Sequence, residues 1–156
     1  MTDLAALLNA LRGVRFILVG GMAAVAHGSA RLTQDVDIVY ARDAENLRSL
    51  VAALEPHAPY LRGAPPGLPF QWDQRTLGAG LNFTLTTRLG PIDLLGEIVG
   101  GGGYEALRSS ALELELFGER CLCIGLEKLI EVKRAAGRPK DLEAIAELEL
   151  IRDGLE

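Results

Sequence analysis

Apolar and polar residues follow two periods along this chain, and each period predicts a different kind of element. Leucines recur at helical spacing over residues 4–11, and Gly13 follows at the position where glycine favours the end of a helix. The branched apolar run Arg15–Val19 predicts a buried strand, whereas Asp35–Tyr40 alternates acidic and apolar residues as a half-buried strand does. The alanine-rich segment Met22–His27 between them predicts a short helix.

The middle of the chain combines one clear helix with a long stretch that is rich in proline. Asp43 is a favourable N-cap for a helix that reaches Leu54 and stops at a proline. Five of the seven prolines lie within residues 56–80, so most of this stretch is predicted to be irregular. Apolar alternation resumes in Asn82–Thr87 and Ile92–Leu95, which together predict a hairpin.

The C-terminal part predicts further short strands and two closing helices. The expected order is a flexible break at glycines 100–103, a short helix at Tyr104–Leu107, strands at Leu112–Phe117 and Cys121–Ile124, and helices at Leu126–Ala136 and Pro139–Arg152. The whole order predicts one α+β (mixed α/β) domain over residues 1–156, in which a mixed sheet is flanked by helices, with two helices at the C-terminus.

Composition changes this picture only by excluding some classes of protein. The chain is 49% hydrophobic and 24% charged, which is too apolar for a disordered protein. The net charge of −5 argues against a protein that wraps duplex DNA. The N-terminus does not resemble a signal sequence, and no apolar stretch is long enough to span a bilayer, so we expect a cytoplasmic protein without a membrane partner. Cys121 and Cys123 lack further Cys or His partners in sequence and are interpreted as core thiols.

The candidate chemistry begins with Asp35 and Asp37, which are one residue apart on a predicted strand. Their carboxylates therefore project from the same face, with Cα atoms roughly 6–7 Å apart. Two acids so close together repel each other unless solvent or a cation compensates their charge, and Mg²⁺ prefers carboxylate and phosphate oxygens. The alternative is a solvated strand edge, which is the commoner setting for an isolated Asp-x-Asp.

Gly20 and Gly21 add a second element of this candidate site, because they follow a buried strand and precede a helix. Glycine lets the backbone approach a phosphate group, towards which the N–H groups of a helix can point. The alternative is a tight turn that requires a positive φ. Neither a Gly-x-Gly-x-x-Gly turn nor a Gly-x4-Gly-Lys-Ser/Thr loop is present, so those two phosphate-binding classes are not supported.

These two motifs carry a resemblance to a known family. Leu18-Val-Gly-Gly21 followed by Asp35-Val-Asp-Ile38 resembles the signature of the DNA polymerase beta-like nucleotidyltransferase superfamily, and in particular its small, toxin-like bacterial and archaeal members. Asp93 in Pro91-Ile-Asp-Leu94 matches the family's third carboxylate, and Gly137-Arg-Pro-Lys-Asp-Leu142 is similar to a C-terminal element of the small relatives. Many catalytic members have Gly-Ser where this chain has Gly20-Gly21, which removes one hydroxyl contact to phosphate.

The resemblance implies a nucleotidyltransferase-type fold and a metal-dependent enzyme that transfers a nucleoside monophosphate from a triphosphate such as ATP. It implies that Asp35, Asp37 and Asp93 are catalytic and hold Mg²⁺ or Mn²⁺, with Asp93 also a candidate general base. The implied nucleotide-binding residues are Gly20, Gly21, Arg31, Thr33 and Lys140. The acceptor is left open among an RNA such as tRNA, a protein side chain and a small molecule.

Other interpretations remain open beside this one. The chain is alternatively a non-catalytic nucleotide- or partner-binding module, such as one half of a toxin–antitoxin pair that binds its antitoxin, or a nucleotide-binding regulator. A basic group near the C-terminus suits a phosphate or RNA contact but equally suits solvated helix faces; it consists of Lys128, Lys133, Arg134, Arg138 and Lys140. Asp141 is explained by helix capping, and the aromatic residues of the proline-rich stretch are interpreted as anchors of a loop.

Overall fold

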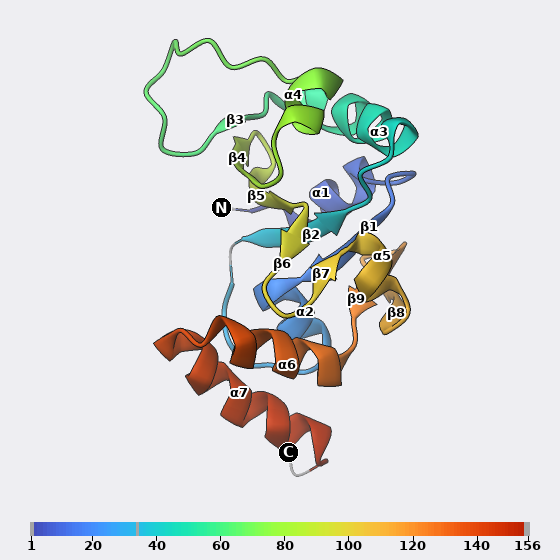
Figure 1. Ribbon diagram of the computed structural model, residues 1–156, viewed down its shortest axis with the longest axis vertical. Coiled ribbons are helices and arrows are strands. Elements are labelled where there is room, and N and C mark those ends of the chain that lie inside the picture. Colours follow the sequence, from blue (N-terminus) through green and yellow to red (C-terminus); the bar gives the residue numbers. More distant parts are fainter. Residues whose placement is uncertain (1, 34, 155–156) are drawn as a thin grey trace.

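The computed structural model describes residues 2–33 and 35–154, whose arrangement is drawn in Figure 1. The helices are α1 (Leu4–Ala10), α2 (Gly20–Ala26), α3 (Ala44–Leu54), the 3₁₀ helix η1 (Glu55–His57), α4 (Gln74–Ala79), α5 (Tyr104–Arg108), α6 (Leu126–Ala136) and α7 (Pro139–Arg152). The strands are β1 (Phe16–Val19), β2 (Val36–Tyr40), β3 (Tyr60–Leu61), β4 (Phe83–Thr87), β5 (Gly90–Leu95), β6 (Glu97–Ile98), β7 (Gly102–Gly103), β8 (Ala111–Leu116) and β9 (Glu119–Ile124). The predicted α+β class is confirmed, and the predicted elements end within two residues of the observed bounds.

Seven of the strands form one mixed sheet in the order β3-β4-β5-β2-β1-β9-β8. The β2–β5 and β1–β9 pairs are parallel, and the other neighbours are antiparallel. All four residues of β1 are buried, because this strand is central and has neighbours on both sides. The parallel β2–β5 pair brings the Asp-x-Asp segment beside the second strand of the β4–β5 hairpin, although the two are far apart in sequence.

The glycines expected to form a flexible break instead take part in a second, two-stranded sheet. β6 and β7 pair antiparallel, with Ile98 opposite Gly102. Gly100 and Gly102 have φ values of +79° and +75°, which glycine adopts without strain and other residues rarely adopt. The glycine run thus permits a tight hairpin, and the sequence prediction was wrong because it treated glycine only as a breaker.

The proline-rich stretch contains more structure than its composition predicted. Asp73 caps α4 by accepting a hydrogen bond from the Thr76 backbone N–H at 2.7 Å. The Trp72 indole N–H donates to the Val51 carbonyl oxygen at 2.9 Å, so this aromatic residue anchors the stretch to α3. Tyr60 and Phe70 contact each other edge to face, with ring centroids 6.1 Å apart. The anchoring role expected of these aromatics is confirmed.

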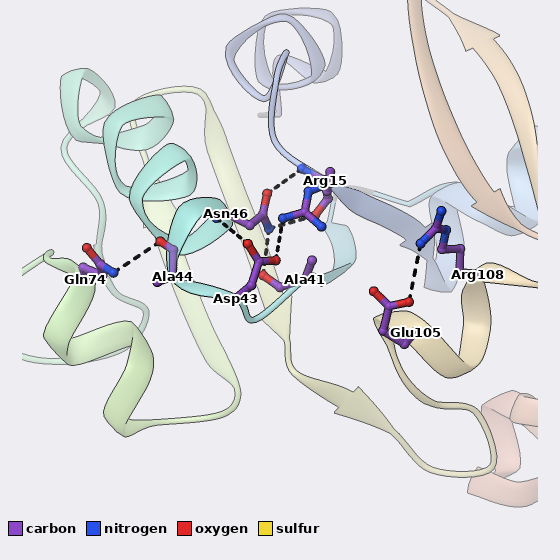
Figure 2. A network of polar contacts seen from close by, with 8 residues as sticks. All are labelled: Arg15, Ala41, Asp43, Ala44, Asn46, Gln74, Glu105 and Arg108. Carbon is purple, nitrogen blue, oxygen red and sulfur yellow. Dashed lines mark hydrogen bonds and ion pairs between the residues drawn. The ribbon is translucent and has the colours of Figure 1, made fainter.

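A buried asparagine joins the start of α3 to the sheet, as Figure 2 shows. Asn46 is 2% exposed, and its amide oxygen accepts a hydrogen bond from the Arg15 backbone N–H at 2.7 Å. Its amide nitrogen donates to the carbonyl oxygens of Arg15 and Ala41, at 3.0 and 2.7 Å. Asp43 caps the same helix, as the sequence predicted. The cluster therefore satisfies backbone groups where β1 begins and β2 ends.

The two C-terminal helices lie side by side at one end of the molecule in Figure 1. Gly137 separates them in the left-handed conformation, with φ of +66°, and Pro139 opens α7 where its missing N–H costs nothing. Helix α6 also contacts α2, which follows directly from β1. The turn between α6 and α7 is thereby brought towards the glycines at the start of α2.

Several minor expectations can be checked in the described part of the chain. Both cysteines are free and buried, which confirms the prediction of core thiols. The ring Nε2 of His27 lies 2.7 Å from the Ile124 carbonyl oxygen, as expected for a packed histidine. Within the described ranges no helix has the length and apolarity needed to cross a bilayer.

Candidate functional site

The register of the sheet aligns two of the three predicted acids. Asp37 of β2 is the direct partner of Asp93 of β5, and Val19 of β1 is its partner on the other side. Partners in neighbouring strands point to the same face of a sheet, so the two carboxylates lie next to each other. Asp35 is exposed and immediately precedes β2, in which Asp37 is half-buried.

Glycine is required at position 20 because the backbone there lies close to the Asp37 carboxylate. Its φ is +69°, and a Cβ at this position would lie only 2.2 Å from Asp37 Oδ2. No side chain fits there without displacing the carboxylate. Gly21 has a related role, because a Cβ there would lie 2.8 Å from the Thr33 hydroxyl oxygen. The sequence had suggested a separate glycine turn before the helix. In the structure the two glycines are instead the first residues of α2.

A pocket of about 280 Å³ opens in front of these glycines. The predicted site residues that line it are Gly20, Gly21, Arg31, Thr33, Asp35, Asp37 and Lys140. Asp93 lies outside this lining, beside Asp37 on the neighbouring strand. The pocket thus brings together residues from the start of α2, the loop before β2, β2 itself and the start of α7.

Three basic residues from the end of α6, the α6–α7 turn and the start of α7 line the same pocket. Lys133, Arg138 and Lys140 line it, and Lys140 is exposed. Arg138 donates from Nε to Asp141 Oδ2 at 2.6 Å, and Asp141 is only 2% exposed. Burial lowers the pKa of Lys133, although the nearby carboxylate of Asp141 opposes this shift.

The other two members of the predicted basic group have a different environment. Lys128 pairs with Glu131 along α6, at 3.2 Å, and Arg134 pairs with Glu149 of α7, at 3.4 Å. Neither is in the lining of the pocket. These two side chains thus form ion pairs with glutamates of α6 and α7, and a contact of either with RNA stays a prediction.

The loop before β2 is fixed to α7 by hydrogen bonds. The Ser29 hydroxyl donates to Glu147 at 2.6 Å, and the Ala30 backbone N–H donates to the other oxygen of that carboxylate at 3.1 Å. Arg31 lies 3.8 Å from Glu147 and 4.0 Å from Glu143, so its charge is partly compensated. The Thr33 hydroxyl donates weakly to the Asp35 carbonyl oxygen at 3.4 Å. These contacts set one wall of the pocket.

The electrostatic environment of Asp37 is unusual. Burial, together with the neighbouring carboxylates of Asp93 and Asp35, raises the pKa of Asp37 to about 7. The Arg62 guanidinium opposes this shift. The effects of burial and of the neighbouring acids on the pKa of Asp37 thus outweigh that of the Arg62 charge.

Arg62 is a residue of the site that sequence reasoning missed. Its backbone N–H donates to the Thr84 carbonyl oxygen, and its guanidinium Nη2 lies 2.9 Å from Asp93 Oδ1. This ion pair lacks hydrogen-bond geometry, because Asp93 Oδ1 and Arg62 Nε have no hydrogen-bond partner among the described residues. Arg62 follows a two-residue edge strand inside the proline-rich stretch, where no periodicity indicated which way its side chain would point.

Asp37 and Asp93 offer carboxylate oxygens of the kind that bind a divalent cation. Asp37 Oδ1 and Asp93 Oδ1 are buried and accept no hydrogen bond from any described residue. Residues 2–33 and 35–154 contain no group of three or more His, Cys, Asp or Glu side chains arranged to hold a metal ion. Mg²⁺ is commonly held by one or two carboxylates with phosphate and water oxygens. Asp37 and Asp93 therefore fit as a partial ligand set that a phosphate group would complete.

The resemblance to nucleotidyltransferases depends on the motif residues and on the geometry around Asp37, because similarity to known sequences adds nothing to it. A scan against protein-family models finds no match, and a search of curated proteins finds no significantly similar sequence.

Proposed function

We propose that this protein is a metal-dependent nucleotidyltransferase that transfers a nucleoside monophosphate from a nucleoside triphosphate to an acceptor. The observation that carries the proposal is the in-register pair Asp37 and Asp93, whose buried Oδ1 atoms accept no hydrogen bond from the described residues. This pair lies beside a pocket that three basic side chains also line. Basic side chains lining the same pocket as Asp35 and Asp37 suit a triphosphate that arrives with a divalent cation, although Asp141 pairs with Lys133 and Arg138 in the protein alone.

The basic and the acidic residues have separate parts in this reaction. Lys133, Arg138 and Lys140 would bind the phosphate oxygens and compensate their charge. Asp37 and Asp93, with the exposed Asp35 beside them, would hold Mg²⁺ or Mn²⁺. When bound, this ion would neutralise phosphate charge and lower the pKa of an acceptor hydroxyl. Gly20 leaves the space in which the Asp37 carboxylate lies.

The chemistry is a single displacement at phosphorus. The acceptor oxygen forms a bond to the α-phosphorus, the bond from that phosphorus to the α–β bridging oxygen breaks, and pyrophosphate leaves with the bonding electrons. Asp93, the register partner of Asp37, would accept the proton of the acceptor hydroxyl. The acceptor is an RNA such as tRNA, a protein side chain or a small molecule, and the reaction would take place in the cytoplasm, where nucleoside triphosphates are available.

A second function is favoured by one observation, the ion pair between Arg62 and Asp93. This pair already neutralises an acid that a divalent cation would otherwise use. A chain that keeps it in every state would bind nucleotides or a partner without catalysis, as in a non-catalytic member of a toxin–antitoxin pair. The two functions differ in whether the acids are needed for turnover.

The deciding experiment is calorimetry with the four ribonucleoside triphosphates in the presence of Mg²⁺. The wild-type chain is compared with the double variant Asp35→Ala, Asp37→Ala. The matched control is Glu113→Ala, Glu115→Ala, which removes two exposed acids at the same spacing on strand β8. Circular dichroism of each variant confirms folding.

We expect metal-dependent binding that is lost in the aspartate variant and kept in the control. Transfer of label from an α-³²P triphosphate to a candidate acceptor then distinguishes the enzyme from the non-catalytic module. Absence of binding to every triphosphate, or equal binding by the aspartate variant, would contradict the proposal.

A further inference from the structure

A second pocket, of about 150 Å³, adjoins the first on the far side of Gly20 and Asp37. The two pockets share Gly20, Asp37, Lys133, Arg138 and Asp141. The remaining lining of the second pocket is aliphatic and consists of Val19, Leu95, Ile98, Leu129, Val132 and Ala136. We call this second pocket the aliphatic niche.

The aliphatic niche is lined by elements that are far apart in the sequence. Leu129 and Val132 belong to α6, and Leu95 and Ile98 belong to β5 and to the β6–β7 hairpin. The hairpin lies directly against α6, because a Cβ on Gly100 would be 2.5 Å from the Ala135 Cβ. Glycine at this position is therefore what allows the hairpin to close one side of the niche.

The two pockets differ in chemistry as the two ends of a nucleotide do. The first is lined by carboxylates and basic groups, whereas the niche adds aliphatic side chains, including Leu129, which is 1% exposed. A nucleoside triphosphate has a polyanionic chain at one end and a flat base with apolar faces at the other. The first pocket, of about 280 Å³, is near the lower end of the volumes typical of small-molecule sites, and the shared lining joins the niche to it, so one ligand can extend into both.

We infer that the aliphatic niche binds the nucleobase of the triphosphate whose phosphate groups lie in the first pocket. This inference rests on the proposed function and adds a base subsite to it. Lys133 and Arg138 line both pockets, which places them where the phosphate chain meets the nucleoside. The side chains that belong to the niche alone carry no amide or hydroxyl group, so they contact the base faces without reading its edges. The four triphosphates therefore bind with affinities within about tenfold of one another.

The test compares each nucleoside triphosphate with inorganic tripolyphosphate, which has the phosphate chain and no base. Val132→Phe fills the niche from α6, and Glu131→Phe places the same ring on the neighbouring exposed position as a control. Ala136→Phe is a second filling variant at an exposed end of the helix, where an added ring does not disturb the core. Binding of both ligands is measured by calorimetry in Mg²⁺.

We expect the wild-type protein to bind triphosphates more tightly than tripolyphosphate. Both filling variants weaken triphosphate binding about tenfold or more and leave tripolyphosphate binding unchanged, because a ring in the niche excludes the base. Equal affinity of wild-type protein for the two ligands, or filling variants that bind triphosphates normally, overturns the niche assignment and leaves the proposed function intact. Absence of binding to either ligand overturns the proposed function, and the base subsite with it.

Discussion

Arg62 forms an ion pair with Asp93 in which the guanidinium Nη2 lies 2.9 Å from the carboxylate Oδ1. The same Nη2 donates to the Leu85 carbonyl oxygen at 2.7 Å, so the guanidinium is held between the edge of the sheet and the candidate site. Arg62 also lowers the pKa of Asp37, against the larger effects of burial and of the neighbouring acids. One basic residue from the proline-rich stretch thus competes with any divalent cation for the paired carboxylates.

Replacing Arg62 tests this competition. We expect Arg62→Ala to raise the affinity for Mn²⁺ by about three- to tenfold, because an unopposed pair of carboxylates attracts a cation more strongly. Arg62→Lys keeps the positive charge and should change the affinity less. Calorimetric titration of the nucleotide-free protein with Mn²⁺ measures both effects. Weaker Mn²⁺ binding by Arg62→Ala would show instead that Arg62 positions Asp93 for the ion.

Gly20 provides a second test, because its replacement adds a close contact to backbone strain. Both Gly20 and Gly13 have a positive φ, +69° and +89°, but a Cβ on Gly13 meets no described atom within 4 Å. Gly13→Ala is therefore expected to cost about 1 kcal/mol from strain alone. Gly20→Ala should cost about 1–3 kcal/mol more, since its Cβ must displace the Asp37 carboxylate. Urea unfolding gives both values, and equal losses would contradict the assigned contact.

The local elements were predictable from sequence because their signals are local. The N-cap at Asp43 and the leucine spacing that follows predicted α3, and alternation predicted β2 and β8. The contact between Asp37 and Asp93 was expected only through a family resemblance, because the parallel pairing of their strands depends on the whole sheet. The ion pair of Arg62 had no signal, since a short edge strand in a proline-rich stretch gives no period.

The aliphatic niche was also beyond sequence reasoning, for a related reason. Helix α6 and the β6–β7 hairpin, which line it, are far apart in sequence. The need for glycine at position 100 follows only from its contact with Ala135, which the sequence does not show. Val132 follows Leu129 by three residues on α6, a spacing that indicates an apolar face but not the empty space beside it. Sequence patterns report which face of an element is apolar, whereas a pocket depends on how two such faces fail to fill the space between them.

The raised pKa of Asp37 predicts how the metal-free protein responds to pH. In the unfolded chain this carboxyl has its ordinary pKa of 3.8, whereas in the folded protein the value is about 7. The folded state therefore retains a proton that the unfolded state has lost, so the free energy of unfolding decreases as pH rises from about 4 to about 7. The decrease is on the order of 1–4 kcal/mol.

The measurement is urea unfolding in EDTA between pH 4.5 and 7.5. Carboxyls with lowered pKa values, such as Asp43 and Glu119, gain their stabilising effect mainly below this range and do not obscure the slope. Asp37→Asn should remove most of the slope. A wild-type protein whose stability is level or increases across this range would contradict the assigned environment of Asp37.

Asn46 predicts a loss of stability that is independent of any function. Asn46→Ala would leave the Arg15 N–H and the Ala41 carbonyl oxygen without these partners (Figure 2), whereas the Arg15 carbonyl oxygen would keep its hydrogen bond from the Ala41 N–H. We expect the free energy of unfolding to fall by about 2–4 kcal/mol, because each unsatisfied buried group keeps its desolvation cost. Gln74→Ala is the matched control: Gln74 also donates to a backbone carbonyl oxygen, that of Ala44 at 3.2 Å, but in an exposed position, so its loss should cost less than about 0.5 kcal/mol. Urea unfolding of the two variants separates these values, and a small loss for Asn46→Ala would mean that water replaces the amide.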